Sequence, residues 1–456
     1  MSLKQESVNA ESRKMAFKQE TAHGMETSNL TFHPDAKGIE DQVVNLYPQV
    51  TFQEIEGFGG AITDAAAYVY SLMSEEQKRQ LIQTYFSPSN MKYCLVRIHM
   101  DSCDFSTGIY EAMSDEADRE LKSFSFARTE KYILPMLEAA QKAAGKPLKL
   151  MLSPWSPPAF MKTNGQRVAG GSLKEGMEGF WADYICRYIL EFQKRGFAVQ
   201  RISLQNEPKA VQTWDSCVYT AKQEKRFLRD FMYPALQSHG LSEVEIFIWD
   251  HNKERLFERA SHLIDDTTKG MVAGAAFHWY SGDHFEALEL TRQKYPDLKL
   301  IISESCIEYK KYAAGEEWEN AERLSHEIIG DLNHGMCAFY DWNLLLDEEG
   351  GPNHVGNFCH APFLYDRRQK SLLPQKIQRC FAHFSSHILP GAKRIGFSKY
   401  TDLLDVTAFQ NPDGSIVAII LNRSSKEVPV TLRLEGALAQ ITALPRSIST
   451  GVIQQA

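Results

Sequence analysis

Two glutamates stand at the ends of short apolar runs, where a strand would give way to a loop. Glu207 closes the run at residues 199–207, and Glu304 closes the run at residues 298–304. Two carboxyl groups on either side of a sugar are the groups that hydrolyse a glycosidic bond. In a configuration-retaining reaction one of them donates and later removes a proton, and the other attacks the anomeric carbon. The pair therefore indicates the chemistry of a retaining β-glycosidase.

The residue before Glu207 indicates which carboxyl group has which role. Asn206 can hydrogen-bond a sugar 2-hydroxyl, and that contact strengthens as the oxocarbenium-like transition state forms. We therefore predict that Glu207 is the acid and base and that Glu304 is the nucleophile. The plainer interpretation of either glutamate alone is a salt-bridged surface residue at a strand end. The Asn-Glu-Pro triplet and the spacing of 97 residues, about three barrel repeats, argue against that interpretation for the pair.

Eight candidate strands alternate with helical segments through the middle of the chain. A capping box at 74–77 opens a helix that runs to about residue 85, and apolar residues recur at the helical period over 180–192, 222–236 and 321–332. Strands that alternate with crossover helices predict a closed parallel (β/α)8 barrel, an α/β fold whose active site lies at the carboxyl ends of the strands. The candidate strands begin near residues 57, 94, 148, 200, 245, 272, 299 and 335.

Closely spaced strands replace this pattern beyond residue 388. The first two are joined by Asn-Pro-Asp-Gly at 411–414, which is typical of a hairpin turn. The short spacing leaves no room for crossover helices and predicts an all-β sandwich as a side domain, which strands near 42–52 join. The strand-like segments are 400–409, 416–421, 428–434 and 441–444.

These patterns predict a chain of four parts, with the side domain built from both chain ends. The parts are a polar, flexible N-terminal segment at 1–28, strands of the sandwich at 29–53, the catalytic barrel at 54–385 and the C-terminal sandwich at 386–456.

Composition excludes several function classes. A net charge of −8 provides no basic patch for nucleic acid. No stretch approaches the roughly 18 consecutive apolar residues of a transmembrane helix, and the first 24 residues contain no apolar core of a secretory signal. We therefore expect a soluble protein, in the cytoplasm or, if a leader precedes this sequence, secreted. The eight cysteines lack paired spacing and are expected to be reduced.

Seven motifs occur in order, each at a predicted strand end. With them the chain resembles the glucosylceramidase-like hydrolases of glycoside hydrolase family 30, from about Phe58 to residue 450. The resemblance implies hydrolysis of β-glucosides, above all of the glucosylceramide type, by double displacement without a cofactor. It also implies the same roles for Glu207 and Glu304. The motifs are GFGGAITD at 57–64, SCDFS at 102–106, SPWSPP at 153–158, QNEP at 205–208, HWY at 278–280, SESC at 303–306, and DWN at 341–343 with EGGPN at 349–353.

The resemblance implies further contacts to the sugar, carried over position by position. Asp104 would accept hydrogen bonds from glucose hydroxyls, Trp155 and Trp342 would bind the sugar ring, and Tyr280 would touch the nucleophile. Asn357 matches a polar residue near the rim of the sugar site. Two plainer interpretations stand beside these: Asp104 as the N-cap of a following helix, and Trp155 as a packed loop anchor.

No metal site is predicted, because His278 and His284 lack a third ligand at suitable spacing. The sequence departs from the animal lysosomal relatives at His354, where an aromatic residue is expected, and the loop at 164–171 is individual to this chain. We expect these two places to shape the leaving-group side of the site.

Two other functions stay open from the sequence. The first is the same mechanism on another β-glycan, as in a β-1,6-glucanase, β-xylosidase or β-fucosidase. The second is a non-catalytic glycan-binding protein on the same scaffold. The expected partner is a β-glucoside or glucosylated lipid, and a lipid substrate would bring transient contact with a membrane surface.

Overall fold

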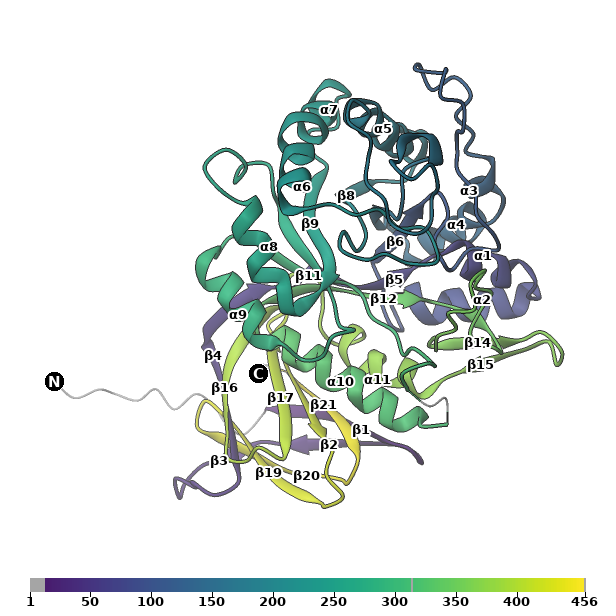
Figure 1. The fold of residues 1–456 in the computed structure, drawn as a ribbon. Coiled ribbons are helices and arrows are strands. Elements are labelled where there is room, and N and C mark those ends of the chain that lie inside the picture. The colour runs from purple at the N-terminus through teal and green to yellow at the C-terminus, as the bar shows by residue number, and fades with distance from the viewer. Residues whose placement is uncertain (1–12, 313–314, 455–456) are drawn as a thin grey trace. The chain divides into compact units, whose positions relative to one another are not determined.

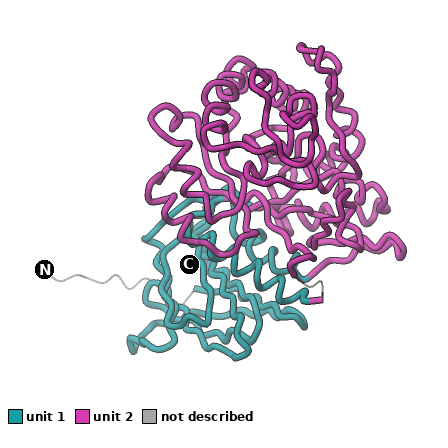
Figure 2. Tube along the Cα trace, viewed as in Figure 1, with its two compact units in different colours: residues 1–57, 316–337, 376–456 teal, residues 58–315, 338–375 magenta. Residues whose placement is uncertain are grey.

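The computed structural model describes residues 13–312 and 315–454, and the chain divides into two compact units (Figure 2). Unit 1 contains residues 1–57, 316–337 and 376–456, and unit 2 contains residues 58–315 and 338–375. Among the helices of the described residues, none has both the length and the apolar character needed to cross a membrane. All eight cysteines lie among the described residues, where they are buried and form no disulfide bond.

Unit 2 is built around a closed barrel of eight parallel strands (Figure 1). Each strand begins within two residues of its predicted start, so the predicted (β/α)8 barrel is confirmed. The barrel closes in the order β10-β11-β12-β5-β6-β7-β8-β9. Its strands are β5 (Gly57–Ala61), β6 (Leu95–Met100), β7 (Lys149–Pro154), β8 (Val199–Ser203), β9 (Glu245–Asn252), β10 (Gly274–His278), β11 (Lys299–Glu304) and β12 (Met336–Asn343).

The glycines of β5 allow close approach of its neighbours in the barrel. A Cβ atom on Gly59 would lie 1.9 Å from the carbonyl oxygen of Leu95, and one on Gly60 would lie 2.5 Å from a methyl group of Leu344. Gly59 is therefore required where the first barrel strand meets the second, because its neighbour is backbone. At Gly60 a side chain would displace the end of the Leu344 side chain, in the loop after β12.

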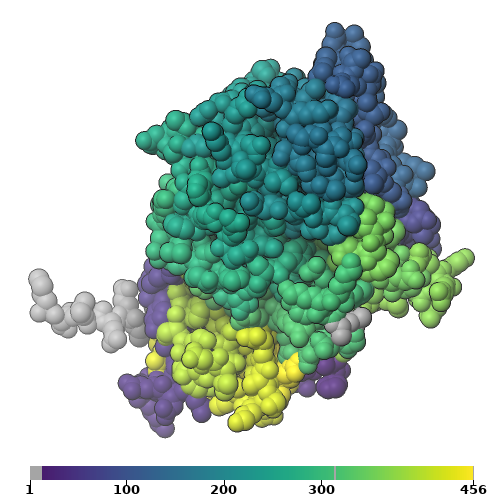
Figure 3. Space-filling model, viewed as in Figure 1, coloured from purple at the N-terminus to yellow at the C-terminus, as the bar shows by residue number. Residues whose placement is uncertain are grey.

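The helices of unit 2 follow the signals in the sequence. The predicted capping box at Ser74 and Gln77 is present and opens α2 (Glu75–Phe86). The segment 222–236 is helical in three pieces, because a π-helical turn separates α6 (Ala221–Phe227) from α7 (Tyr233–Ser238). The other helices are α1 (Asp64–Ser71), α3 (Ala127–Lys131), α4 (Ile133–Ala144), α5 (Glu178–Lys194), α8 (Leu256–Leu263) and α9 (Phe285–Lys294). Between β6 and α3, residues 101–126 form a loop that protrudes from unit 2 (Figures 1 and 3).

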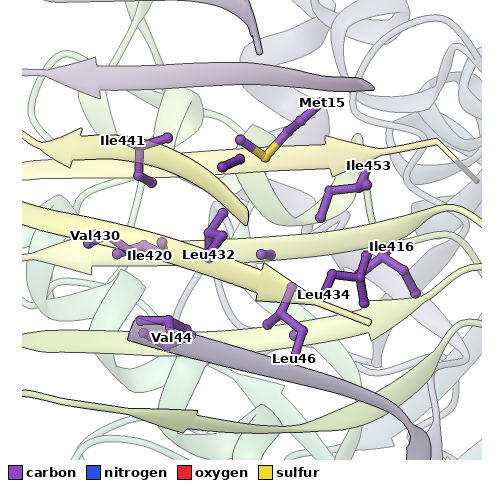
Figure 4. Close-up of a cluster of buried hydrophobic side chains, with 14 of the residues drawn as sticks. Met15, Val44, Leu46, Ile416, Ile420, Val430, Leu432, Leu434, Ile441 and Ile453 are labelled. Carbon is purple, nitrogen blue, oxygen red and sulfur yellow. The ribbon is translucent and has the colours of Figure 1, made fainter. Parts of the chain in front are cut away.

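Unit 1 contains a ten-stranded sheet that closes over an apolar core. Its strands run in the order β2-β1-β21-β18-β17-β16-β4-β19-β20-β3, and all neighbours are antiparallel except β4 and β19. Figure 4 shows the core, to which strands from both chain ends contribute; Met15 and Val44 lie beside Ile453 and Leu432. The strands are β1 (Lys14–Thr21), β2 (Gly24–Thr31), β3 (His33–Pro34), β4 (Val43–Glu54), β16 (Lys393–Lys399), β17 (Leu404–Gln410), β18 (Ile416–Asn422), β19 (Val428–Leu434), β20 (Ala437–Ala443) and β21 (Ser447–Ile453).

The prediction of a flexible segment at 1–28 is wrong for residues 14–28. These residues form most of the β1–β2 hairpin, and β1 also pairs with β21 at the other end of the chain. Met15 is fully buried in the core of unit 1. Local composition missed the hairpin because its partner strand lies more than 400 residues away, and pairing of that kind leaves no local signal. The first 12 residues lie outside the described part of the chain.

Two helices of unit 1 come from residues that precede the C-terminal strands. They are α10 (Glu317–Asn333) and α11 (Lys376–Ser385), which pack against each other. Within unit 1, the Arg446 guanidinium pairs with Glu322 of α10, and the Trp318 indole donates a hydrogen bond of 3.0 Å to the Arg446 carbonyl. A small sheet of β13 (Leu346–Asp347), β14 (Phe363–Asp366) and β15 (Ser371–Pro374) completes unit 2.

Candidate active site

One pocket at the carboxyl ends of the barrel strands brings together all eight residues that the sequence analysis singled out. They reach it from the ends of six strands and the loops that follow them. The eight are Asp104, Trp155, Asn206, Glu207, Tyr280, Glu304, Trp342 and Asn357. The pocket is also lined by eight residues that the sequence analysis did not assign to it: Phe105, Gln212, Trp214, His251, Asn252, Cys306, Glu308 and Cys359.

Glu207 lies in the loop after β8, in a strained backbone conformation. Its φ angle is 47°, in the left-handed region that a residue with a side chain enters at a cost of about 1 kcal/mol. Its N–H donates to the Asp250 carbonyl at 2.9 Å, and the N–H of Asn206 donates to the Pro154 carbonyl at 2.8 Å. These bonds to the ends of β9 and β7 hold the strained turn, and they turn the Glu207 side chain towards the pocket.

Two irregularities in the barrel place polar side chains beneath the pocket. Asp250 is an extra residue in β9 where the pairing with β10 slips, and its φ angle is 54°. Ser303 is an extra residue in β11 at a similar slip against β10, and its hydroxyl donates to Asp250 at 2.5 Å. Bulges of this kind re-aim side chains next to active sites. Here they bring Asp250 to the barrel interior.

Arg97, on β6, connects the residues on the floor of the pocket. Its guanidinium donates to Glu304 Oε2 at 2.6 Å, to Asp250 Oδ2 at 2.9 Å and to Asn206 Oδ1 at 2.8 Å. The side chain is fully buried, so it needs these acceptors to offset the loss of water. It also lies 4.8 Å from the ring centroid of Trp155, which stacks on Trp342 with centroids 5.3 Å apart. Arg97 therefore fixes both the glutamate and the aromatic wall.

Glu304, the last residue of β11, accepts hydrogen bonds on both oxygens. Arg97 contacts one oxygen, and the Tyr280 hydroxyl donates to the other at 2.8 Å. Burial raises the pKa of Glu304, and it outweighs the opposing positive charges of His278 and Arg97. The neighbouring Glu207 carboxylate raises this pKa further.

Glu207 contacts His278, at the end of β10. The distance from His278 Nδ1 to Glu207 Oε1 is 3.3 Å, and the other ring nitrogen lies 3.1 Å from Asp250. Burial alone would raise the pKa of Glu207, but the hydrogen bond with His278 and the rings of His251 and His278 outweigh it and lower the pKa. Burial lowers the pKa of His278, yet the surrounding carboxylates, Glu304 first, raise it to about 9. These directions are the reverse of those expected for a protonated acid at Glu207 and an ionised nucleophile at Glu304.

Asp104 lies on the opposite side of the pocket from His278, in the loop after β6. Asn353 and Asn357 both donate to its Oδ2, at 3.2 and 3.4 Å. Burial and the nearby Glu304 raise the pKa of Asp104 to about 8. No helix begins within 20 residues after Asp104 in this described stretch, so the alternative of a helix N-cap is wrong. Trp155 is 2% exposed and packs among other aromatic residues, so it lines the pocket and anchors its loop as well.

The family of the chain follows from comparisons with known proteins. The model of the glycosyl hydrolase family 30 TIM-barrel domain matches residues 55–388, and that of the family 30 β-sandwich domain matches residues 391–451. The chain belongs to glycosyl hydrolase family 30. It is therefore a glycoside hydrolase, as the sequence analysis predicted.

Relatives of this family 30 hydrolase extend over most of its length. It is 32% identical to lysosomal acid glucosylceramidase of Mus musculus over 86% of this chain and 79% of the relative. It is 25% identical to endo-1,6-β-D-glucanase neg1 of Aspergillus fumigatus over 89% of this chain and 86% of the relative. Among solved structures, SrfJ of Salmonella typhimurium is 36% identical and superposes with a TM-score of 0.94 over 97% of this chain and 100% of that chain.

The predicted outer wall of the pocket differs from the observed one. The pocket lining includes neither the loop at 164–171 nor His354, which the sequence analysis expected to shape the leaving-group side. The loop lies behind Gln212, whose carbonyl accepts a hydrogen bond of 2.8 Å from Ala169. His354 lies behind Asp104, to whose carbonyl its N–H donates at 3.2 Å. Both places support pocket residues from outside.

His278 and His284, weighed above as a metal pair, separate in the structure. His278 is fully buried between carboxylates, and His284 lies on the surface near Ser281. Within residues 13–312 and 315–454, no cluster of His, Cys, Asp and Glu side chains has the size to hold a metal ion.

Sequence reasoning missed Arg97, Asp250 and His251. A signal was present for the first two, since each is a charged residue inside an otherwise apolar strand, where an unpaired charge is too costly. That signal predicts a partner but not which one. The partner depends on the two bulges, and a one-residue slip of register cannot be read from a single strand.

Proposed function

We propose that this family 30 hydrolase cleaves β-glucosides, with glucosylceramide-type lipids as its preferred substrates, by double displacement with retention of configuration. The observation that carries the proposal is that Glu207 and Glu304 line one pocket with the six other residues predicted for the site. The identity to a lysosomal acid glucosylceramidase over most of both chains supports the choice of substrate.

In the first step Glu304 attacks the anomeric carbon while the bond to the leaving oxygen breaks. Glu207 gives its proton to that oxygen, so the leaving group departs as an alcohol and a glycosyl ester forms on Glu304. Tyr280 and Arg97 hold one oxygen each of the Glu304 carboxylate, which keeps the nucleophile oriented and stabilises it when it is released again.

In the second step a water molecule attacks the same carbon. Glu207, now ionised, takes a proton from the water, and the ester bond to Glu304 breaks to release the sugar. Two carboxyl groups that interact strongly titrate as a pair, and the proton they share can occupy either one. A glycosidic oxygen beside Glu207 offers an acceptor there, so we expect substrate binding to move the shared proton from Glu304 to Glu207.

The proposed glucose contacts lie on one wall of the pocket. Asp104 presents a carboxyl group that Asn353 and Asn357 hold in place, and such a group can accept from two sugar hydroxyls. Burial raises the pKa of Asp104 to about 8. Sugar hydroxyls that donate to Asp104 favour its ionised form, so the Asp104 carboxyl group should release its proton when the sugar binds. The stacked Trp155 and Trp342 provide an apolar face for the ring.

A second candidate is hydrolysis of a β-1,6-linked glucan by the same two steps. The similarity to endo-1,6-β-D-glucanase neg1 over 86% of that protein favours it. The two candidates share the nucleophile and the acid, and they differ only in the leaving group.

Hydrolysis of aryl β-glucoside, β-xyloside and β-fucoside, measured beside fluorescent glucosylceramide and a β-1,6-glucan, tests the proposal. Proton NMR of the first sugar anomer released reports retention. Glu304→Gln should abolish turnover with an unchanged melting temperature, whereas Glu138→Gln, at an exposed position on α4, should have no effect. Glu207→Ala should slow unactivated substrates far more than aryl glycosides with good leaving groups, which need no proton.

Each outcome decides between the candidates. Aryl cleavage with glucan cleavage and no lipid cleavage would replace the lipid by the glucan. Full activity in Glu304→Gln, or a product of inverted configuration, would refute the mechanism. No hydrolysis of any substrate by the unchanged protein would favour the glycan-binding alternative.

A further inference from the structure

The closed barrel divides the pocket into two arcs. The proposed acid stands after β8 and the proposed nucleophile ends β11, so the line between them separates the other strands into two groups. One arc contains β12, β6 and β7. The proposed glucose contacts lie on these strands or in the loops that follow them. On the other arc only β9 and β10 lie between the two glutamates. The residues of the first arc are Asp104, Trp155, Trp342 and Asn357.

The second arc must face the leaving group. The acid protonates the oxygen that joins glucose to its leaving group, so the leaving group begins beside Glu207, away from the glucose wall. His251 and Asn252, the last two residues of β9, line the pocket here. His251 is near enough to Glu207 for each to affect the charge of the other.

The side chains of His251 and Asn252 are held in place, and each has one buried polar atom without a hydrogen-bond partner among the described residues. The His251 ring stacks on Trp249, with centroids 5.0 Å apart, and the Trp249 indole donates to the Asn252 carbonyl at 2.9 Å. Among the described residues, neither His251 Nδ1 nor Asn252 Oδ1 has a partner, although both atoms are buried. Buried polar atoms are nearly always paired, and those at the wall of a pocket can be paired by what enters it.

We propose that His251 and Asn252 form a leaving-group subsite that selects β-glucosides whose leaving group carries hydroxyl or amide groups near the scissile oxygen. This inference rests on the proposed function and deepens it. An amide side chain donates and accepts, and a neutral imidazole does the same through its two nitrogens, so the pair suits a group with several hydroxyls. Burial lowers the pKa of His251, which keeps the ring neutral at neutral pH. Gln212 adds a second amide to the pocket lining.

Two kinds of leaving group have this chemistry: a second sugar, and the amide-and-hydroxyl head of a ceramide. Three β-glucosides that all release a primary alcohol separate them. Gentiobiose releases a sugar, glucosylceramide in detergent micelles releases a ceramide, and octyl β-glucoside releases an alcohol with no further polar group. Since the leaving oxygen is alike in all three, differences in kcat/KM report the subsite and not the chemistry of bond cleavage.

The test compares Asn252→Ala and His251→Phe with the unchanged protein on these substrates. His251→Phe keeps a ring to stack on Trp249 and removes only the nitrogens. Each variant should lower the ratio of kcat/KM for the polar substrate to that for octyl β-glucoside by about 3- to 10-fold, the value of one neutral hydrogen bond. Asn90→Ala, at an exposed position, serves as the matched control and should leave the ratio unchanged.

The outcomes separate the two proposals. A fall for gentiobiose alone assigns the subsite to a sugar, and a fall for glucosylceramide alone assigns it to a ceramide head. A ratio within twofold of the unchanged protein in both variants overturns the subsite and leaves the proposed function intact. Failure of the unchanged protein to hydrolyse any of the three overturns both. If one variant melts early, the other still decides, because they remove different groups.

Discussion

His278 offers the sharpest test of how the site holds its proton. It lies between Glu207 and Asp250, and its tautomer and charge therefore affect the pKa of Glu207. The surrounding carboxylates raise the pKa of His278 to about 9, so the ring should be positively charged at neutral pH. His278→Gln removes that charge while the new amide can still donate to Asp250. The pKa of Glu207 should then rise.

The size of the effect follows from the distance between the two groups. Unit charges 3.3 Å apart interact by about 5 kcal/mol at an effective dielectric constant of about 20, which is an upper bound. Asp250 takes up part of the His278 charge, and opposite charges at such distances shift a pKa by about 1 to 3 units. We expect the pKa of Glu207 to rise by a shift in that range.

The pH profile of kcat/KM on octyl β-glucoside measures this shift, because that substrate needs a proton from the acid. The basic limb should move to higher pH by at least about one unit in His278→Gln. An aryl β-glucoside with a good leaving group should show little change in the same limb. His284→Gln, at a partly exposed position outside the pocket lining, is the matched control, and melting curves identify loss of fold.

The direction of the shift separates two states of the site. If His278 were neutral, its free nitrogen would accept a hydrogen bond from protonated Glu207. The Gln carbonyl could accept that bond in place of the ring nitrogen, and the basic limb would stay in place. That result would refute the charged imidazole and, with it, the explanation of why the pKa of Glu207 is lowered.

Two other predictions concern single buried groups. Tyr280→Phe removes one of the two donors to Glu304 and should lower kcat by about 10- to 100-fold, since a hydrogen bond to a charged group contributes about 1.5–3 kcal/mol. Steady-state kinetics measure this loss, and a loss of less than twofold would mean that the hydrogen bond does not contribute to the reaction. Asp341, on β12, is buried with one carboxyl oxygen unpartnered among the described residues, and burial raises its pKa well above the ordinary value. Between the ordinary pKa and the raised folded-state pKa, unfolding therefore releases a proton, and stability falls by up to about 1.4 kcal/mol per pH unit as the pH rises above about 4 towards the folded-state pKa. Asp341→Asn stays neutral, so its melting temperature should exceed that of the unchanged protein at pH 7 and approach it below pH 4; a lower melting temperature at pH 7 would mean that the carboxylate is ionised in the folded chain.

The barrel could be predicted because its strands carry their own signal. Each buried strand of a parallel barrel is a short apolar run followed by a polar segment, and eight such runs alternate with helical periods. The paired glutamates followed from the same pattern, since the carboxyl ends of parallel strands meet at one edge. All eight predicted site residues line the pocket, and their individual roles stay predictions until they are tested.

The features that could not be predicted depend on pairing between distant segments. The β1–β2 hairpin is polar and irregular as a sequence, and it is ordered by β21 and by the burial of Met15. The wall formed by His251 and Asn252 depends on the slip at Asp250, which decides which residues of β9 face the pocket. Without that slip the side chains of His251 and Asn252, which follow Asp250, would each point to the opposite face of β9.

The charges beneath the pocket explain why one of the two glutamates must hold a proton. Arg97 and His278 are positive, and Asp250 balances one of these charges because Arg97 and its other donors keep its pKa low despite burial. One positive charge remains for two glutamates that are buried in the same pocket. Ionising both would leave an uncompensated buried charge, which is far costlier than protonating one of them. The proton that the proposed first step transfers therefore follows from the charge balance of the barrel interior, and Arg97 and Asp250 control the proposed acid although neither touches its side chain.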